Sequence, residues 1–83
     1  MTKRATVGDV VIAEIREMLN LNAADITPQS RLIDLGAQSF DFVELILRLE
    51  KQFDVSLPKE LMIPDSHTVA RYIDEIVAAT RDR

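Results

Sequence analysis

The stretch LGAQSFDFV, residues 35–43, contains the side chain best suited to chemistry in this sequence, the hydroxyl of Ser39. It follows a turn that contains Gly36 and precedes a strongly apolar run with helical spacing. Serine is among the residues that most often cap a helix N-terminus, so one interpretation of Ser39 is purely structural. The alternative is an exposed hydroxyl beside unpaired backbone N–H groups and a positive dipole end, an arrangement that stabilises a phosphate ester.

A catalytic role for Ser39 would require a general base within reach. His67 is the only histidine and no G-x-S-x-G elbow is present. Because His67 directly precedes an expected helix start, we expect it to lie in solvent. Asp41 is expected to interact favourably with the helix dipole rather than to act as a base. The sequence therefore predicts a protein that is not an enzyme.

Composition also argues against a metal centre. The chain has no cysteine, so it has neither a thiolate ligand nor a thiol nucleophile of its own. Its acidic residues are dispersed, and no D-x-D-x-D-G calcium loop is present. We expect no metal site.

The helix that starts near Ser39 is predicted to span residues 39–53. Its apolar residues are Phe40, Phe42, Val43, Leu45, Ile46, Leu47, Leu49 and Phe53. They cover more than half of the helix circumference, which is wider than one packing face requires. Phe40 and Leu47 lie at the edge of the apolar face and flank Glu44, which predicts a small binding surface one turn from Ser39.

The remaining helices follow from apolar periodicity and from start signals. They are expected over residues 7–20, 59–63 and 69–80. Thr6, with Asp9 three residues later, predicts the start of the first of them. Thr68 is a suitable N-cap for the last one, and the short one is framed by two prolines.

The connection 21–38 has no helical period, and a loop of this length needs apolar anchors or a function. Its expected anchors are Leu21, Ile26, Leu32, Ile33 and Leu35. The elements together predict an all-α protein, a small antiparallel four-helix bundle of three longer helices and one short helix. We expect a single domain over residues 1–83. Its interior is expected to be lined by Val43, Ile46, Leu49, Ile73 and Ile76.

The charge distribution limits the partners of this bundle. The net charge is −4, and residues 38–65 carry six acids against three bases. An acidic chain without a basic stripe argues against nucleic acid, whereas it suits a docking surface for basic partners. The N-terminus is a poor signal peptide and no stretch approaches the length of a membrane span. We expect a cytoplasmic protein.

From LGAQSFDFVELILRLEKQFDV, residues 35–55, the chain resembles the acyl carrier protein family, also called the phosphopantetheine-attachment domain. The resemblance covers most of the sequence. It includes the first helix, the loop with LIDLG at residues 32–36 and the last helix, introduced by HTVARYI.

The resemblance implies that a separate phosphopantetheinyl transferase uses coenzyme A and Mg²⁺ to attach 4′-phosphopantetheine to Ser39. This arm supplies the thiol that the chain lacks, and acyl or aminoacyl groups are bound to it as thioesters. In this scheme the carrier catalyses nothing. A cargo-activating ligase or synthetase loads the arm, and the carrier then presents the cargo to acyltransferase or synthase enzymes at raised effective concentration.

The resemblance also implies a partner-binding face on the second helix and the short helix. Its residues in this chain are Phe40, Asp41, Glu44, Leu47, Glu60 and Met62. We expect a discrete, monomeric carrier, serving either a specialised acyl pathway or an amino acid supplied by a stand-alone activating enzyme. The sequence leaves the cargo open between these two classes.

Two positions depart from the family pattern, which usually reads Asp-Ser-Leu at the attachment site. Gln38 stands where the aspartate is usual, and Phe40 replaces the leucine and enlarges the apolar surface. Arg48 dilutes the acidic character of the second helix and is spaced to pair with Glu44. The alternative to a modified carrier is a carrier-like helical scaffold or regulatory module that is never modified.

Overall fold

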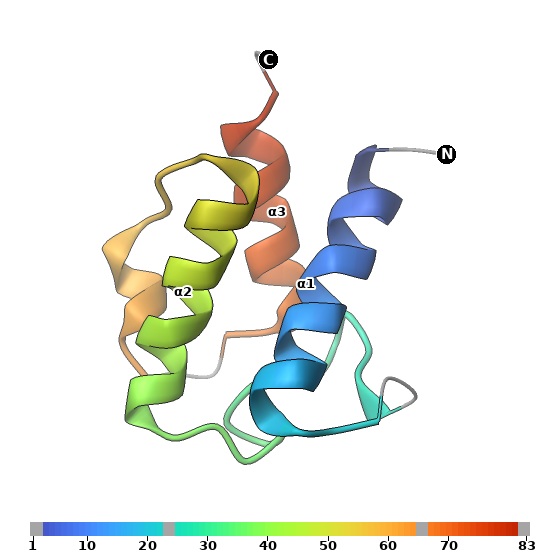
Figure 1. The fold of residues 1–83 in the computed structure, drawn as a ribbon, viewed down its shortest axis with the longest axis vertical. Helices are drawn as coiled ribbons and strands as arrows, with labels where there is room; N and C mark the ends of the chain where they lie inside the picture. The colour runs from blue at the N-terminus through green and yellow to red at the C-terminus, as the bar shows by residue number, and fades with distance from the viewer. Residues whose placement is uncertain (1–2, 23–24, 65–66, 82–83) are drawn as a thin grey trace.

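The computed structural model describes residues 3–22, 25–64 and 67–81. Its helices are α1 (Lys3–Leu19), α2 (Ser39–Phe53) and α3 (Val69–Ala79), with a short 3-10 helix, η2 (Lys59–Met62) (Figure 1). In this part of the chain no strand forms, and Arg31 and Thr68 make an isolated antiparallel bridge. The predicted all-α bundle of three longer helices and one short helix is confirmed.

Only α1 is antiparallel to the other two long helices, and the fully antiparallel arrangement that we expected is wrong for α2 and α3. Figure 1 shows that α1 runs in one direction while α2 and α3 both run in the other. The reason is the connection between α2 and α3, in which η2 carries the chain back along the bundle before α3 begins.

The first helix begins earlier than Thr6 and Asp9 predict. It starts at Lys3, so that Thr6 lies inside the helix and is not its cap. The added turn is held to α3, because the Lys3 ammonium donates to the Thr80 carbonyl and Arg4 pairs with Asp74. The predicted end near Asn20 is confirmed: this residue has a φ of 56°, and the Leu21 N–H donates to the Arg16 carbonyl at 2.9 Å.

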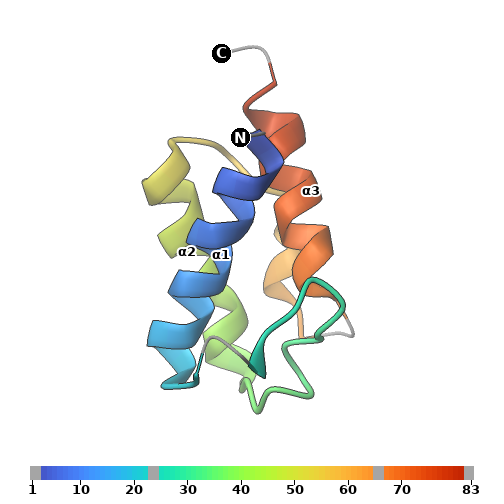
Figure 2. The same cartoon turned by 90° about the vertical axis from the view of Figure 1, so that its right-hand side faces the viewer.

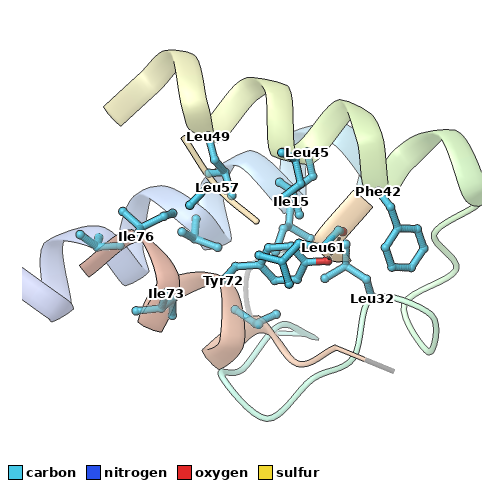
Figure 3. Packing of buried hydrophobic residues seen from close by; sticks show 14 of the residues in the cluster. Ile15, Leu32, Phe42, Leu45, Leu49, Leu57, Leu61, Tyr72, Ile73 and Ile76 are labelled. Carbon is cyan, nitrogen blue, oxygen red and sulfur yellow. Dashed lines mark hydrogen bonds between the residues drawn. The ribbon is translucent and has the colours of Figure 1, made fainter. Parts of the chain in front are cut away.

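The hydrophobic core draws on every element, as Figure 3 shows. Its fully buried side chains include Val11, Ile15, Leu32, Phe42, Leu45, Ile46, Leu49, Leu61, Val69, Tyr72 and Ile76. Of the five expected loop anchors, Ile26 and Leu32 are buried and Leu21 and Leu35 pack against the core, but Ile33 is 48% exposed. The long connection is thus pinned to the bundle, with one of its apolar residues left outside.

The loop also satisfies the first backbone donors of α3. The Val69 and Ala70 N–H groups donate to the carbonyls of Ser30 and Pro28, both at 2.8 Å. Thr68 caps the helix as predicted, because its hydroxyl accepts from the Arg71 N–H at 3.3 Å. Figure 2 shows the loop passing beside the first turn of α3. These bonds fix the segment that leads to Ser39.

The two glycines should respond oppositely to alanine. Gly36 has a φ of 95°, so Gly36→Ala strains the backbone although its Cβ would meet no atom within 4 Å, and we expect a loss of about 1 kcal/mol in unfolding free energy. Gly8 lies inside α1, where the new Cβ would make an ordinary 3.5 Å contact with Ile73 Cδ1, so Gly8→Ala should gain about 0.5–1 kcal/mol. Urea unfolding of both variants checks the signs, and a shared sign would contradict this assignment.

The only tyrosine of the chain offers a direct test of core packing. Burial raises the pKa of Tyr72 to about 12, against the opposing charge of Arg71. Because the folded chain holds this proton more tightly than the unfolded chain, its contribution to stability is full below about pH 10 and is lost as the pH rises toward 12. Absorbance titration of tyrosinate should show a raised midpoint in the folded protein and an ordinary one in denaturant. An ordinary midpoint in both would mean that the ring is solvated.

Candidate functional site

Ser39 is the first residue of α2 and does not cap it. The N-cap is Gln38, with the extended dihedrals φ −100° and ψ 172°. The cap interpretation of Ser39 is therefore wrong, because the helix begins one residue earlier than a Ser39 cap would require. Ser39 is exposed, and its hydroxyl has no hydrogen-bond partner among the described residues. The hydroxyl is free for a covalent bond.

The start of α2 is stabilised by Asp41 rather than by Ser39. The Asp41 carboxylate accepts a hydrogen bond from the Gln38 backbone N–H at 2.7 Å, and the Asp41 N–H donates to the Gln38 carbonyl at 2.9 Å. Asp41 is only 7% exposed as a result. Its predicted contact with partners stays a prediction, and the structure leaves little of its surface for that contact.

The turn before Ser39 is held by its own backbone. The Ala37 N–H donates to the Leu32 carbonyl at 3.1 Å, and the Gly36 N–H donates to the Ile33 carbonyl at 3.3 Å. The positive φ of Gly36 allows the chain to turn there into α2. Ser39 is thus presented by a defined turn on one side and by a helix on the other.

These residues fit a phosphate group esterified to Ser39. Besides the exposed hydroxyl, the Ser39 and Phe40 backbone N–H groups have no acceptor within the described chain. They lie at the positive end of the α2 dipole, which favours an anion. When bound there, 4′-phosphopantetheine would supply a terminal thiol that can hold a cargo as a thioester.

The outward side of α2 is more apolar than predicted. Phe40 and Leu47 are 63% and 54% exposed, in agreement with their predicted place at the edge of the apolar face. Val43 is 40% exposed, so its predicted place in the interior is wrong. The inward side is already filled by Phe42, Leu45, Ile46 and Leu49. Val43 and Leu47 follow Phe40 by three and seven residues, so all three side chains lie on one stripe of the helix. This spacing is the sequence signal that could have predicted the exposure of Val43.

Glu44 is engaged within the molecule. Arg48 lies 2.8 Å from the Glu44 carboxylate, as the spacing of four residues predicts. The same guanidinium reaches α1, where it lies 3.2 Å from Glu14 and 3.8 Å from Glu17. Hydrogen bonding to Glu14, and then to Glu44, raises the pKa of Arg48 against the opposing effect of burial. Arg48 therefore ties α2 to α1, and its single charge is shared among three acids, of which Glu44 flanks Phe40 and Leu47.

The predicted residues of the short helix occupy different environments. Glu60 is exposed and pairs with Arg71 of α3 at 3.1 Å, whereas Met62 packs partly against the core. Ile63, which follows η2 directly, is 61% exposed. The partner face expected from the sequence does not include Ile63, whose only local signal is its position directly before Pro64.

His67 is not in open solvent. It is half-buried, its ring meets Tyr72 edge-on with the centroids 6.2 Å apart, and Nε2 lies 3.2 Å from the Glu60 carbonyl. The expectation was wrong because the His67 ring lies against the backbone of η2 and the ring of Tyr72, contacts that the local sequence does not predict. The contacts of His67 therefore hold η2 against α3.

Other site types find little support in the described residues. No group of three or more His, Asp or Glu side chains is placed to hold a metal ion in this part of the chain. None of the helices described here combines the length and the apolar character of a membrane span. An open cleft of about 370 Å³ lies between α1, the loop and α3. Gly8, Ile12, Pro28 and Ile73 are among its lining residues, and no predicted site residue is.

Comparison with known proteins agrees with the geometry around Ser39. The profile of a family described as "Phosphopantetheine attachment site" matches residues 9–76. An acyl carrier protein of Helicobacter pylori strain J99 is 42% identical over 66 residues, which cover 76% of this chain and 85% of that protein. Aminoacyl carrier protein 2 of Bradyrhizobium diazoefficiens is 35% identical over 69 residues, covering 81% and 78%. An acyl carrier protein of Campylobacter jejuni subsp. doylei is 40% identical over 74 residues, covering 82% and 92%. The chain belongs to the phosphopantetheine-attachment family, and it is a carrier protein that presents its cargo on a phosphopantetheine arm.

Proposed function

We propose that Ser39 is the attachment residue of the 4′-phosphopantetheine arm. The observation that supports it is the exposed Ser39 hydroxyl at the first position of α2, without a hydrogen-bond partner among the described residues. A phosphopantetheinyl transferase would bring coenzyme A to this hydroxyl. Ser39 Oγ forms a new O–P bond to the pantetheine phosphate, the pyrophosphate P–O bond breaks, adenosine 3′,5′-bisphosphate leaves and the hydroxyl proton is released.

The cargo is an acyl or aminoacyl group held as a thioester on the arm. Its support is that the relatives include both acyl carrier proteins and aminoacyl carrier proteins. A cargo-activating ligase or synthetase loads the arm, and acyltransferase or synthase enzymes unload it. The carrier itself contributes no catalytic group to these reactions.

The proposal extends to the partner face and the compartment. Partner enzymes would contact Phe40, Asp41, Glu44 and Leu47 on α2, with smaller contributions from Glu60 and Met62 on η2. The proposed dependence on coenzyme A supports a cytoplasmic location, and the chain is proposed to work as a monomer.

Intact mass measurement tests the attachment. The purified chain is incubated with coenzyme A, Mg²⁺ and a broad-specificity phosphopantetheinyl transferase, and each molecule is expected to gain one phosphopantetheine group. Tryptic mapping should place the added mass on the peptide that contains Ser39. A folded chain that gains no mass would favour the unmodified scaffold, and Gln38→Asp would be the next variant to incubate.

A further inference from the structure

We propose that the open cleft between α1, the long loop and α3 is a docking surface separate from α2, and that it takes an arginine side chain of a partner protein. The proposal goes beyond the proposed function and does not depend on the modification of Ser39. The cleft has a volume of about 370 Å³. Its lining is apolar apart from two charged residues: Ala5, Gly8, Ile12, Pro28 and Ile73, with Arg4 and Asp9.

Asp9 is a carboxylate that the fold does not use. Together with Thr6 it predicted a helix start, but α1 begins at Lys3, so Asp9 lies inside the helix and caps nothing. It is exposed, and it has no hydrogen bond or ion pair among the described residues. The other charged lining residue, Arg4, pairs with Asp74. The cleft therefore offers one unpaired negative charge, which is complementary to a cation.

Gly8 keeps the apolar part of the cleft open. Glycine inside a helix costs about 0.5–1 kcal/mol relative to alanine. The fold would accept alanine here, because its Cβ would make only an ordinary 3.5 Å contact with Ile73 Cδ1. Neither Gly8 nor its neighbour Asp9 benefits the stability of α1, and both line the same cleft. Residues that cost stability in this way are typical of binding sites.

An arginine side chain matches both parts of the cleft. Its apolar methylene stem suits the surface of Gly8, Ile12 and Ile73, and its planar guanidinium can bind the Asp9 carboxylate through two hydrogen bonds. Sites for free small ligands enclose most of the ligand surface, whereas this cleft is open. An open cleft suits a side chain that a larger partner holds in place, and arginine is enriched in protein interfaces.

The cleft faces away from α2. Figure 2 shows the side of the molecule on which α1 and the loop lie, with α2 behind α1, and no residue of α2 lines the cleft. A partner bound here would leave the surface around Ser39 uncovered. The carrier would then be held by one protein while an enzyme acts at α2.

The test is a nuclear magnetic resonance titration of the ¹⁵N-labelled chain with the capped peptide acetyl-Leu-Arg-Leu amide. We expect saturable shifts at the backbone amides of Gly8, Asp9, Ile12 and Ile73, and none along α2. The control peptide replaces arginine with citrulline, which has nearly the same shape and no charge. It should bind on the order of fivefold more weakly, the effect of losing one exposed ion pair.

Two variants separate the charge from the shape of the cleft. Asp9→Asn should lower the affinity for the arginine peptide to that for the citrulline peptide, whereas Asp25→Asn, which removes the same charge outside the cleft lining, should leave both unchanged. Gly8→Ala should weaken both peptides about fourfold, the worth of one buried methylene, although it stabilises the fold.

Three results would overturn the proposal. They are equal affinities for the two peptides, an Asp9→Asn variant that binds the arginine peptide like the wild type, and the absence of saturable shifts at the cleft. Shifts of the same amides with protein concentration alone would assign the cleft to a second copy of the chain instead. None of these results bears on phosphopantetheine loading, which the mass measurement tests separately.

Discussion

Ser39→Ala is expected to abolish phosphopantetheine incorporation while the fold stays intact. The substitution removes the only oxygen that could form the phosphodiester at this position. Because the N-cap is Gln38 and the Ser39 hydroxyl bonds no described residue, no helix cap is lost. Alanine is also a better helix former than serine. We therefore expect the free energy of unfolding to change by less than about 0.5 kcal/mol, in contrast to the roughly 1 kcal/mol that the loss of a cap would cost.

The matched control is Ser56→Ala, which removes an exposed hydroxyl from the connection after α2. Ser56→Ala should take up phosphopantetheine like the wild type. Intact mass measures loading, and urea unfolding measures stability. Residual loading of Ser39→Ala at the wild-type level would assign the arm to another residue. A large loss of stability would mean that the hydroxyl has a structural role that its environment does not show.

Phe42→Ala is expected to lower the free energy of unfolding by about 3–5 kcal/mol, the usual cost of deleting a fully buried ring. Phe42 has no exposed surface, and its ring lies within the core between α2 and the loop that carries Leu32 (Figure 3). A domain of this size has a total stability on the order of 5–15 kcal/mol, so the substitution removes a large part of it. Partial unfolding at physiological temperature is the expected consequence.

The neighbouring Phe40→Ala provides the contrast, because it deletes the same ring from the opposite side of the same helix. Phe40 is 63% exposed, and we expect a change of less than about 0.5 kcal/mol. Urea unfolding followed by circular dichroism compares the two variants directly. Equal losses of stability would show that α2 is rotated about its axis relative to the orientation described above.

Much of the fold follows from local patterns. The apolar period predicted the three longer helices and two prolines framed the short one, and Thr68 and Asn20 marked ends that the structure confirms. Such signals are readable because each depends on residues within one or two turns of the chain. The same holds for the exposure of Phe40 and Leu47, which follows from a stripe too wide for one packing face. The residues around Ser39 likewise carried a resemblance to a family that the comparisons confirm.

The errors arose where distant segments meet. Lys3 and Arg4 extend α1 by binding α3, a contact between residues about seventy positions apart that no local start signal encodes. His67 is half-buried because its ring lies against Glu60 of η2 and Tyr72 of α3. The direction of α3 relative to α2 depended in the same way on the course of the connection between them.

What the sequence by itself determined is the set of helices and the serine placed at the start of one of them, since both depend on neighbours along the chain. Only the tertiary structure decided what the helix surfaces offer to a partner. Val43 faces outward because other side chains fill the core. Glu44 shares the charge of Arg48 with Glu14 of α1, and Glu60 shares the charge of Arg71 with Glu75 of α3. The exposure and the electrostatic surroundings of a surface side chain depend on every residue near it in space, and residues distant in the sequence come near it only when the helices pack.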